Sequence, residues 1–195
     1  MFIFNTLMLL LNGIDIPQGR IKAIDIKKRV ASLFAGWRIT NVKFNIERTD
    51  SLENEDYTIA GFYLEELQKI EIVLIIPKKA KGYLNIDNPN LFRFHLAQTI
   101  QHEFIHHQQF IKRDELQTDS FSLCMRGNRE QKYLGERDEI DAYSYDIAIE
   151  VNTHGWDKSQ TLNIYRKQFE PDHPVMKRLL KKTYLNLGVL NGRKY

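Results

Sequence analysis

The chain has 195 residues, of which 43% are hydrophobic, and 28 Lys and Arg against 25 Asp and Glu give a formal net charge of +3. This length suits one well-buried domain over residues 1–195 and is short for two, and so mild a charge demands no acidic partner. The single cysteine, Cys124, excludes an internal disulfide framework and favours a reducing compartment such as the cytoplasm.

The first part of the chain, residues 1–89, predicts helices and a small sheet. The apolar run 1–11 lacks a basic leader and a cleavage site and is too short to cross a bilayer, so we expect a core element and no membrane partner. An amphipathic pattern predicts a helix over 20–35 that stops near Gly36.

Three runs follow and predict strands. Residues 38–48 alternate apolar and polar side chains, and residues 58–64 and 69–76 are rich in residues that favour strands, with Pro77 closing the last run. We expect them to form a small antiparallel or mixed sheet, so the fold class is α+β.

The most informative motif lies in the next predicted helix, over about 90–112, which Asn88-Pro89-Asn90 starts. His102-Glu103-Phe104-Ile105-His106 is an HExxH sequence. Two histidines four apart project from one side of a helix and can bind one divalent metal ion, with Glu103 beside them as a proton acceptor.

Helical periodicity predicts two faces for this helix. At 100° per residue, one side of the helix carries His95, His102, His106 and Gln109. The opposite side is apolar, and we expect it to face the core; it carries Ala97, Ile100, Phe104 and Ile111.

A catalytic zinc ion usually has three protein ligands, so a third ligand is needed. The metzincin pattern is excluded, because it requires a later histidine and a glycine at positions that are Lys112 and Gln109 here. The peptide deformylase pattern also fails, because its cysteine ligand precedes the motif, whereas Cys124 follows it. Downstream, the predicted acidic helix 136–151 offers candidates for this third ligand. One side of it carries Glu139, Tyr143, Asp146 and Glu150, and Glu136 lies at the margin of this stripe.

Over about residues 90–150 the sequence resembles the gluzincin group of zincin metallopeptidases, which have HExxH on one helix and a glutamate ligand on a second. The segment Glu139-Ile140-Asp141-Ala142-Tyr143 also resembles a Glu-x-x-Ala run in small zincins, including metallopeptidases encoded by tailed bacteriophages. The resemblance implies His102, His106 and Glu139 as metal ligands and Glu103 as general base. Thermolysin-like enzymes have an aspartate where this chain has Tyr143.

The implied protein is a single zincin-like domain with helices of the metal site over 90–150 and a basic, helical segment over 151–195. Its implied activity is hydrolysis of a protein or peptide substrate by metal-activated water. Zn²⁺ suits the ligands best, and Fe²⁺ or Mn²⁺ remain alternatives. Asp146 would orient a ligand imidazole. The alternatives to Glu139 as ligand are Glu136, Asp138 and Asp141. The candidates for donating a hydrogen bond to the oxyanion of the reaction are Tyr133, Tyr143, Tyr145, His95 and His154.

The zincin plan further implies that the edge strand beside the motif helix binds an extended substrate, with 58–64 and 69–76 as candidates. The connector 113–135 is a candidate cover for the cleft.

Other functions stay open. The phage resemblance allows an assembly component, for instance of a phage particle, with a mainly structural metal, located in the host cytoplasm or the virion. Nucleic acid could bind residues 166–195, which carry eight Lys and Arg against Glu170 and Asp172, although such a run is more often the solvated face of a terminal helix. A di-iron bundle would need a second Glu-x-x-His on another helix. The other such run of the chain, Glu170-Pro171-Asp172-His173, is interrupted by a proline, so we do not expect this bundle.

Overall fold

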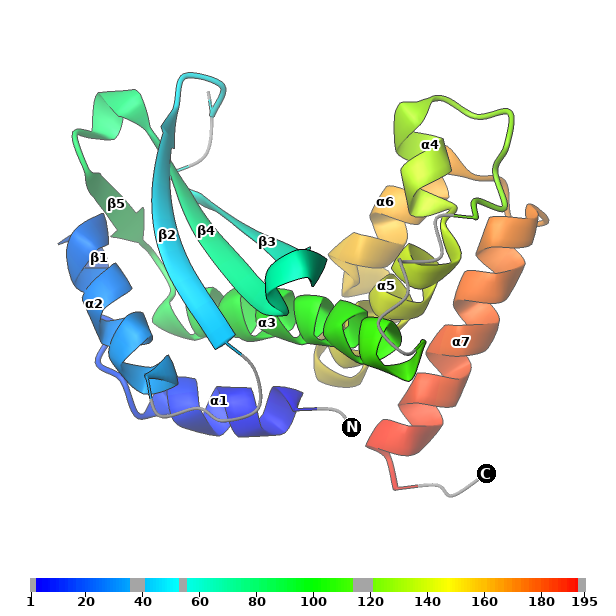
Figure 1. Cartoon of the computed structure of the whole chain (residues 1–195), viewed down its shortest axis with the longest axis horizontal. Coiled ribbons are helices and arrows are strands. Elements are labelled where there is room, and N and C mark those ends of the chain that lie inside the picture. Colours follow the sequence, from blue (N-terminus) through cyan, green and yellow to red (C-terminus); the bar gives the residue numbers. More distant parts are fainter. Residues whose placement is uncertain (1–2, 36–40, 53–55, 114–120, 193–195) are drawn as a thin grey trace. The chain divides into compact units, whose positions relative to one another are not determined.

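The computed structural model describes residues 3–35, 41–52, 56–113 and 121–192, which form two compact units, Met1–His107 and Gln108–Tyr195 (Figure 1). Several predicted features lie outside the described residues: the helix end at Gly36, positions 38–40 of the first strand, positions 114–120 of the connector, and Arg193 and Lys194. The boundary between the units falls within one continuous helix, and the single domain stays a prediction.

The first unit contains a three-stranded sheet whose strands match the predicted runs. These strands are β2 (Asn41–Thr49), β3 (Thr58–Leu64) and β4 (Lys69–Pro77), in the order β2-β4-β3. β3 pairs antiparallel with β4, whereas β2 runs parallel to β4. The sheet is therefore mixed, and a purely antiparallel arrangement is wrong because β3 separates β2 from β4 along the chain. Among the described strands, β3 is an edge strand and β4 is central.

One face of this sheet is apolar and carries a helix. Ile70, Ile72, Leu74 and Ile76 of β4 alternate onto this face and are fully buried. The register places Gly61 and Tyr63 of β3 opposite Ile72 and Ile70, so both belong to the same face. Tyr63 lies against His107, with ring centroids 5.3 Å apart, so the motif helix packs beside the edge strand.

That helix is α3 (Pro89–Lys112), and it begins where the sequence predicts. The Asn88 side chain accepts hydrogen bonds from the backbone N–H groups of Asn90 and Leu91 at 3.0 and 3.1 Å, and Pro89 occupies the first turn. The predicted apolar face is wrong at its end, because Ile111 is 44% exposed in the last turn of the helix.

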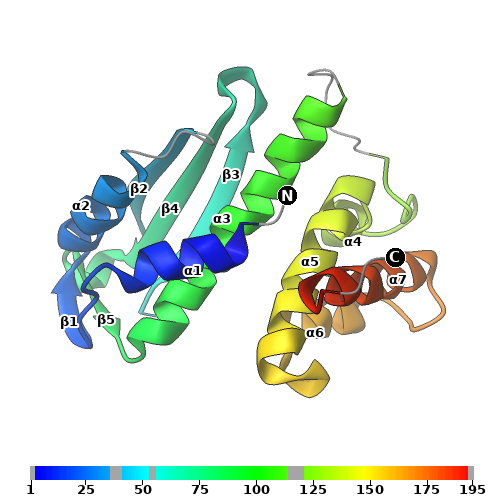
Figure 2. The same ribbon diagram turned by 90° about the horizontal axis from the view of Figure 1, so that it is seen from below.

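Two further helices complete the first unit. α1 (Phe4–Asn12) buries Phe4, Leu7 and Leu11, which confirms the predicted core element. It lies against α3 (Figure 2), where the Ile3 N–H donates to Gln101 Oε1 at 2.7 Å. α2 (Ala23–Phe34) confirms the helix predicted over 20–35. The small pair β1 (Gly19–Lys22) and β5 (Tyr83–Ile86) was not predicted, because four-residue strands carry little periodicity.

The second unit is helical in its described part. It contains α4 (Arg129–Leu134), α5 (Arg137–His154), α6 (Gln160–Gln168) and α7 (Pro174–Leu190). α5 and α7 confirm the predicted acidic and C-terminal helices, whereas α4 lies inside the predicted connector. Residues from all four helices form the core, including Leu134, Ile140, Ile147, Leu162, Tyr165 and Leu179.

Short 3₁₀ turns, η1 (Glu65–Leu67), η2 (Lys78–Ala80) and η3 (Trp156–Lys158), complete the described elements. None of the described helices combines the length and the apolar character that crossing a membrane requires.

The end of α5 is fixed by Glu150, which the sequence placed on the acidic stripe. Its buried carboxylate accepts hydrogen bonds from Ser159 Oγ at 2.6 Å and from the Thr161 backbone N–H and Oγ1 at 3.1 and 2.7 Å. These bonds satisfy groups in the first turn of α6, so Glu150 has a structural role.

We predict that Glu150→Gln lowers the free energy of unfolding by about 1–3 kcal/mol, because an amide cannot accept all of these hydrogen bonds. Urea denaturation followed by circular dichroism measures the change. Glu170→Gln, at an exposed position, is the matched control and is expected to have no effect. Equal stability of the two variants would contradict the role of Glu150.

Candidate metal centre

The two motif histidines lie together on one side of α3. His102 and His106 are 7% and 8% exposed, and their Nε2 atoms are 3.2 Å apart. Two nitrogen ligands of one tetrahedral zinc ion, each about 2.0–2.1 Å from the metal, are about 3.3 Å apart. The pair therefore has the spacing that a shared ion requires.

The same spacing also suits a hydrogen bond between one ring that donates and one that accepts. In either arrangement the two rings point their Nε2 atoms at a common place, with ring centroids 5.0 Å apart. Two buried imidazoles in this arrangement could serve as two ligands of one metal ion.

Glu103 lies against the edge strand β3. Its side chain is 7% exposed. A Cβ atom added to Gly61 would lie 2.6 Å from Glu103 Cγ, 2.7 Å from Glu103 Oε1 and 2.8 Å from Thr99 Cγ2. Such distances are shorter than carbon contacts allow, so Gly61 makes the space that the Glu103 carboxyl group occupies.

Tyr63 and His107 are further contacts of α3 with β3 that the sequence did not reveal. The Tyr63 hydroxyl and His107 Nδ1 are 3.0 Å apart. Burial lowers the pKa of His107 below its usual value of 6.5, because removal from water disfavours the charged ring. Gly61 and Tyr63 stand two apart on β3 and so share a face, and the pairing of β3 with β4 shows that it is the face of Ile70 and Ile72.

Glu139 belongs to the second unit, in the first turn of α5, and is 9% exposed. It lies close to Tyr133 of α4 and Tyr143 of α5. The pKa of Tyr133 is raised far above its usual range by burial and by interactions with Tyr143 and Glu139. A tyrosine in this state keeps its proton and can donate a hydrogen bond to a carboxylate.

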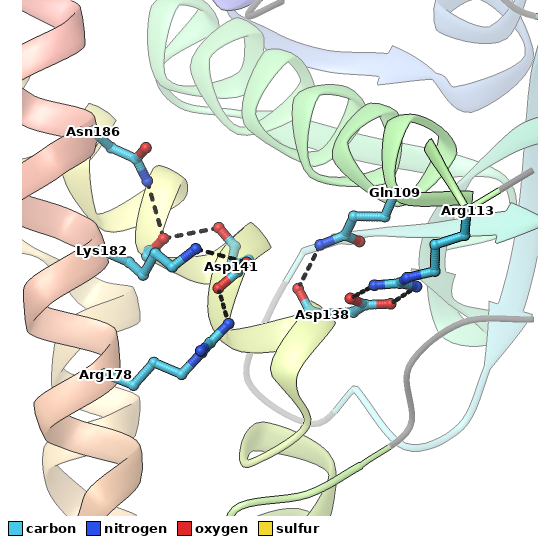
Figure 3. A network of polar contacts seen from close by, with 8 residues as sticks. Gln109, Arg113, Asp138, Asp141, Arg178, Lys182 and Asn186 are labelled. Carbon is cyan, nitrogen blue, oxygen red and sulfur yellow. Dashed lines mark hydrogen bonds and ion pairs between the residues drawn. The ribbon is translucent and has the colours of Figure 1, made fainter. Parts of the chain in front are cut away.

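The neighbouring acids of α5 are held by ion pairs (Figure 3). Asp138 Oδ2 accepts from Arg113 Nη1 at 2.6 Å, and its second oxygen contacts Arg113 Nη2. Asp141 contacts Arg178 and Lys182 of α7, each at 3.0 Å. Of the alternatives to Glu139 as metal ligand, Asp138 and Asp141 are therefore engaged by cations.

These ion pairs also bear on the basic C-terminal segment. Arg178 and Lys182, two of its cations, neutralise Asp141 inside the second unit. Val175 and Leu179 on α7 are fully buried, as expected for a terminal helix with one solvated face. Two cations of the segment are therefore engaged within the second unit.

The remaining candidates for roles around the metal have different surroundings. Tyr143 packs on Tyr165, with ring centroids 5.7 Å apart. Asp146 is 4% exposed and helps raise the pKa of Tyr145, after burial as the main cause. His95 is half-buried two turns before His102, and its ring lies 6.1 Å from that of Phe94.

Comparison with models of known families, with curated proteins and with solved structures gives no match for this chain. Its function must therefore be inferred from its own residues and their geometry.

We predict that Gly61→Ala lowers the free energy of unfolding by about 1–3 kcal/mol, because the added methyl group overpacks the space beside Glu103. Glu103→Ala removes two of the three closest contacts, so the same glycine substitution should cost less in that background. Urea denaturation of the wild type, both single variants and the double variant measures this coupling. Additive effects would show that Gly61 does not accommodate Glu103.

Proposed function

We propose that this protein is a metal-dependent peptidase in which His102, His106 and Glu139 bind one divalent ion and Glu103 is the general base. The observation that carries the proposal is the 3.2 Å separation of the two Nε2 atoms in a buried HExxH helix. A pair of polar rings is costly to bury unless it has partners, and a metal ion is a partner that suits both nitrogens.

The third ligand is supported by the way the first turn of α5 is held. Gln109 and Arg113 follow His102 and His106 by seven residues each, so they continue the same side of α3. Both contact Asp138, the residue before Glu139.

The competing acids strengthen this choice. Arg113 engages Asp138, and Arg178 and Lys182 engage Asp141. Among the residues that the structure describes, His102, His106 and Glu139 are a buried set of side chains that could hold a metal ion.

The donor set of two neutral imidazoles and one carboxylate fits zinc best, and Fe²⁺ and Mn²⁺ accept the same ligands. A bound ion of this kind supplies a Lewis acid that lowers the pKa of water and polarises a carbonyl group. Glu103 then accepts the proton of the attacking water and delivers it to the leaving amine. Burial beside Gly61 keeps its carboxyl group in one place for both transfers.

The edge position of β3 supports a peptide as substrate. β3 pairs with β4 along one side, and its other side is an edge among the described strands. An extended peptide can pair with the N–H and C=O groups of such an edge as an added strand. Because Gly61 of this strand contacts Glu103, a peptide bound there would lie close to the general base.

We predict that the wild-type protein binds one zinc ion per chain and that Glu103→Gln keeps this ion but cleaves peptides about 100-fold or more slowly. Calorimetric zinc titration measures binding, and mass spectrometry of a mixed peptide library measures cleavage. Glu66→Gln, at an exposed position in η1, is the matched control and should keep full activity.

His102→Ala and His106→Ala should each lose high-affinity zinc binding, because each removes one ligand. Zinc binding without cleavage by the wild type would instead support a structural metal in an assembly component. Retained cleavage by Glu103→Gln would refute the assignment of the general base.

A further inference from the structure

The last turn of α3 and the first turn of α5 are joined by a clamp that we define as Gln109, Arg113 and Asp138 (Figure 3). Arg113 contacts both carboxylate oxygens of Asp138 through its two terminal nitrogens. Gln109 Nε2 donates to the Asp138 backbone oxygen at 3.2 Å. Side chain and main chain of Asp138 are thus both held from α3, and this two-point contact restrains the orientation of the turn as well as its position.

The clamp occupies the same side of α3 as the motif histidines. Counting 100° per residue, His102, His106, Gln109 and Arg113 fall within about 60° of one another. α3 is an unbroken helix from Pro89 to Lys112, and Arg113 follows it directly. One continuous helix therefore carries the two imidazoles and, one turn later, the groups that contact Asp138.

We propose that Arg113 is a positioning residue for the metal centre. Arg113 holds the Asp138 carboxylate while Gln109 holds the Asp138 backbone oxygen, and this restraint aims the carboxylate of the next residue, Glu139. This inference rests on the proposed function, in which Glu139 is the third ligand. It assigns the Arg113–Asp138 pair a role in metal affinity that exceeds its role in holding the fold together.

α5 has further anchors on α7, so its folding does not depend on the clamp alone. Asp141 pairs with Arg178 and Lys182, and the Asn186 side chain donates to Ser144 Oγ at 3.0 Å (Figure 3). The apolar residues Ile140 and Ile147 are fully buried in the core of the second unit. Loss of the clamp should therefore leave α5 folded but less restrained in its first turn.

The choice of variants follows from burial. The Asp138 side chain is 5% exposed, so removing Arg113 alone would leave a buried charge without its partner and could unfold the protein. The double variant Arg113→Gln/Asp138→Asn removes both charges and keeps similar shapes. Arg113→Lys keeps the charge but loses the two-pronged contact, so it should be intermediate.

The control is the ion pair that joins α5 to α7. Its arginine matches Arg113 in exposure, 34% for Arg178 against 30%, whereas Asp141 is 30% exposed against 5% for Asp138. Arg178→Gln/Asp141→Asn removes an ion pair from the same helix without touching the clamp.

We predict that Arg113→Gln/Asp138→Asn binds zinc about 10- to 100-fold more weakly than the wild type, as is typical when a group that orients a metal ligand is removed. Arg178→Gln/Asp141→Asn should bind zinc as the wild type does. The measurements are zinc titration by calorimetry, the melting temperature of each metal-free protein, and the visible spectrum of the cobalt(II) forms, which reports a changed ligand set only in the clamp variants.

Each outcome decides between the two proposals. Absence of zinc binding by the wild type overturns the proposed function and this inference together. Tight zinc binding by the wild type and equally by the clamp variant overturns this inference and leaves the function standing. Equal weakening in the control pair would also overturn it, because the effect would then come from the stability of α5 in general.

Discussion

The proposed centre depends on one constraint, the periodicity of α3. Residues four apart on a helix project from the same side, and in this chain that spacing brings two Nε2 atoms to 3.2 Å from each other. The middle of α3 is also buried at six consecutive positions, 101–106, so its polar side chains need partners within the protein. The helix places the histidines together, and their burial gives a reason to expect a bound ion.

The position of Glu103 depends on a different element. Glu103 lies one residue from His102, so it points about 100° away around the helix, toward β3. The strand can approach because residue 61 has no side chain, and any larger residue there would collide with the carboxyl group. The strand that packs on Glu103 is also an edge among the described strands, so a single close contact links the proposed general base with the proposed peptide site.

Local patterns in the sequence predicted the elements that carry the site. The β-rich run over 58–64 matches β3, and the Asn88-Pro89 start of α3 is confirmed by its capping hydrogen bonds. Contacts between distant residues were not predictable, because periodicity says nothing about partners. The parallel pairing of β2 with β4, the fit of Gly61 against Glu103 and the grip of Arg113 on Asp138 all belong to this group. The metal ligands were proposed from the motif, and the residues that surround them came from the structure.

The acids of α5 show why a motif alone cannot assign a carboxylate. Asp138 and Asp141 share the helix with Glu139 and are alternatives to it as ligand by their position in the sequence, and Glu150 lies on the same acidic stripe as Glu139. In the fold Asp138 and Asp141 bind cations and Glu150 caps α6, so their oxygens are committed to structure. A carboxylate engaged by an arginine is a poor metal ligand, because the metal would have to replace that cation. Glu139, whose surroundings include the phenols of Tyr133 and Tyr143 instead, is therefore the acid of this helix that we propose as the metal ligand.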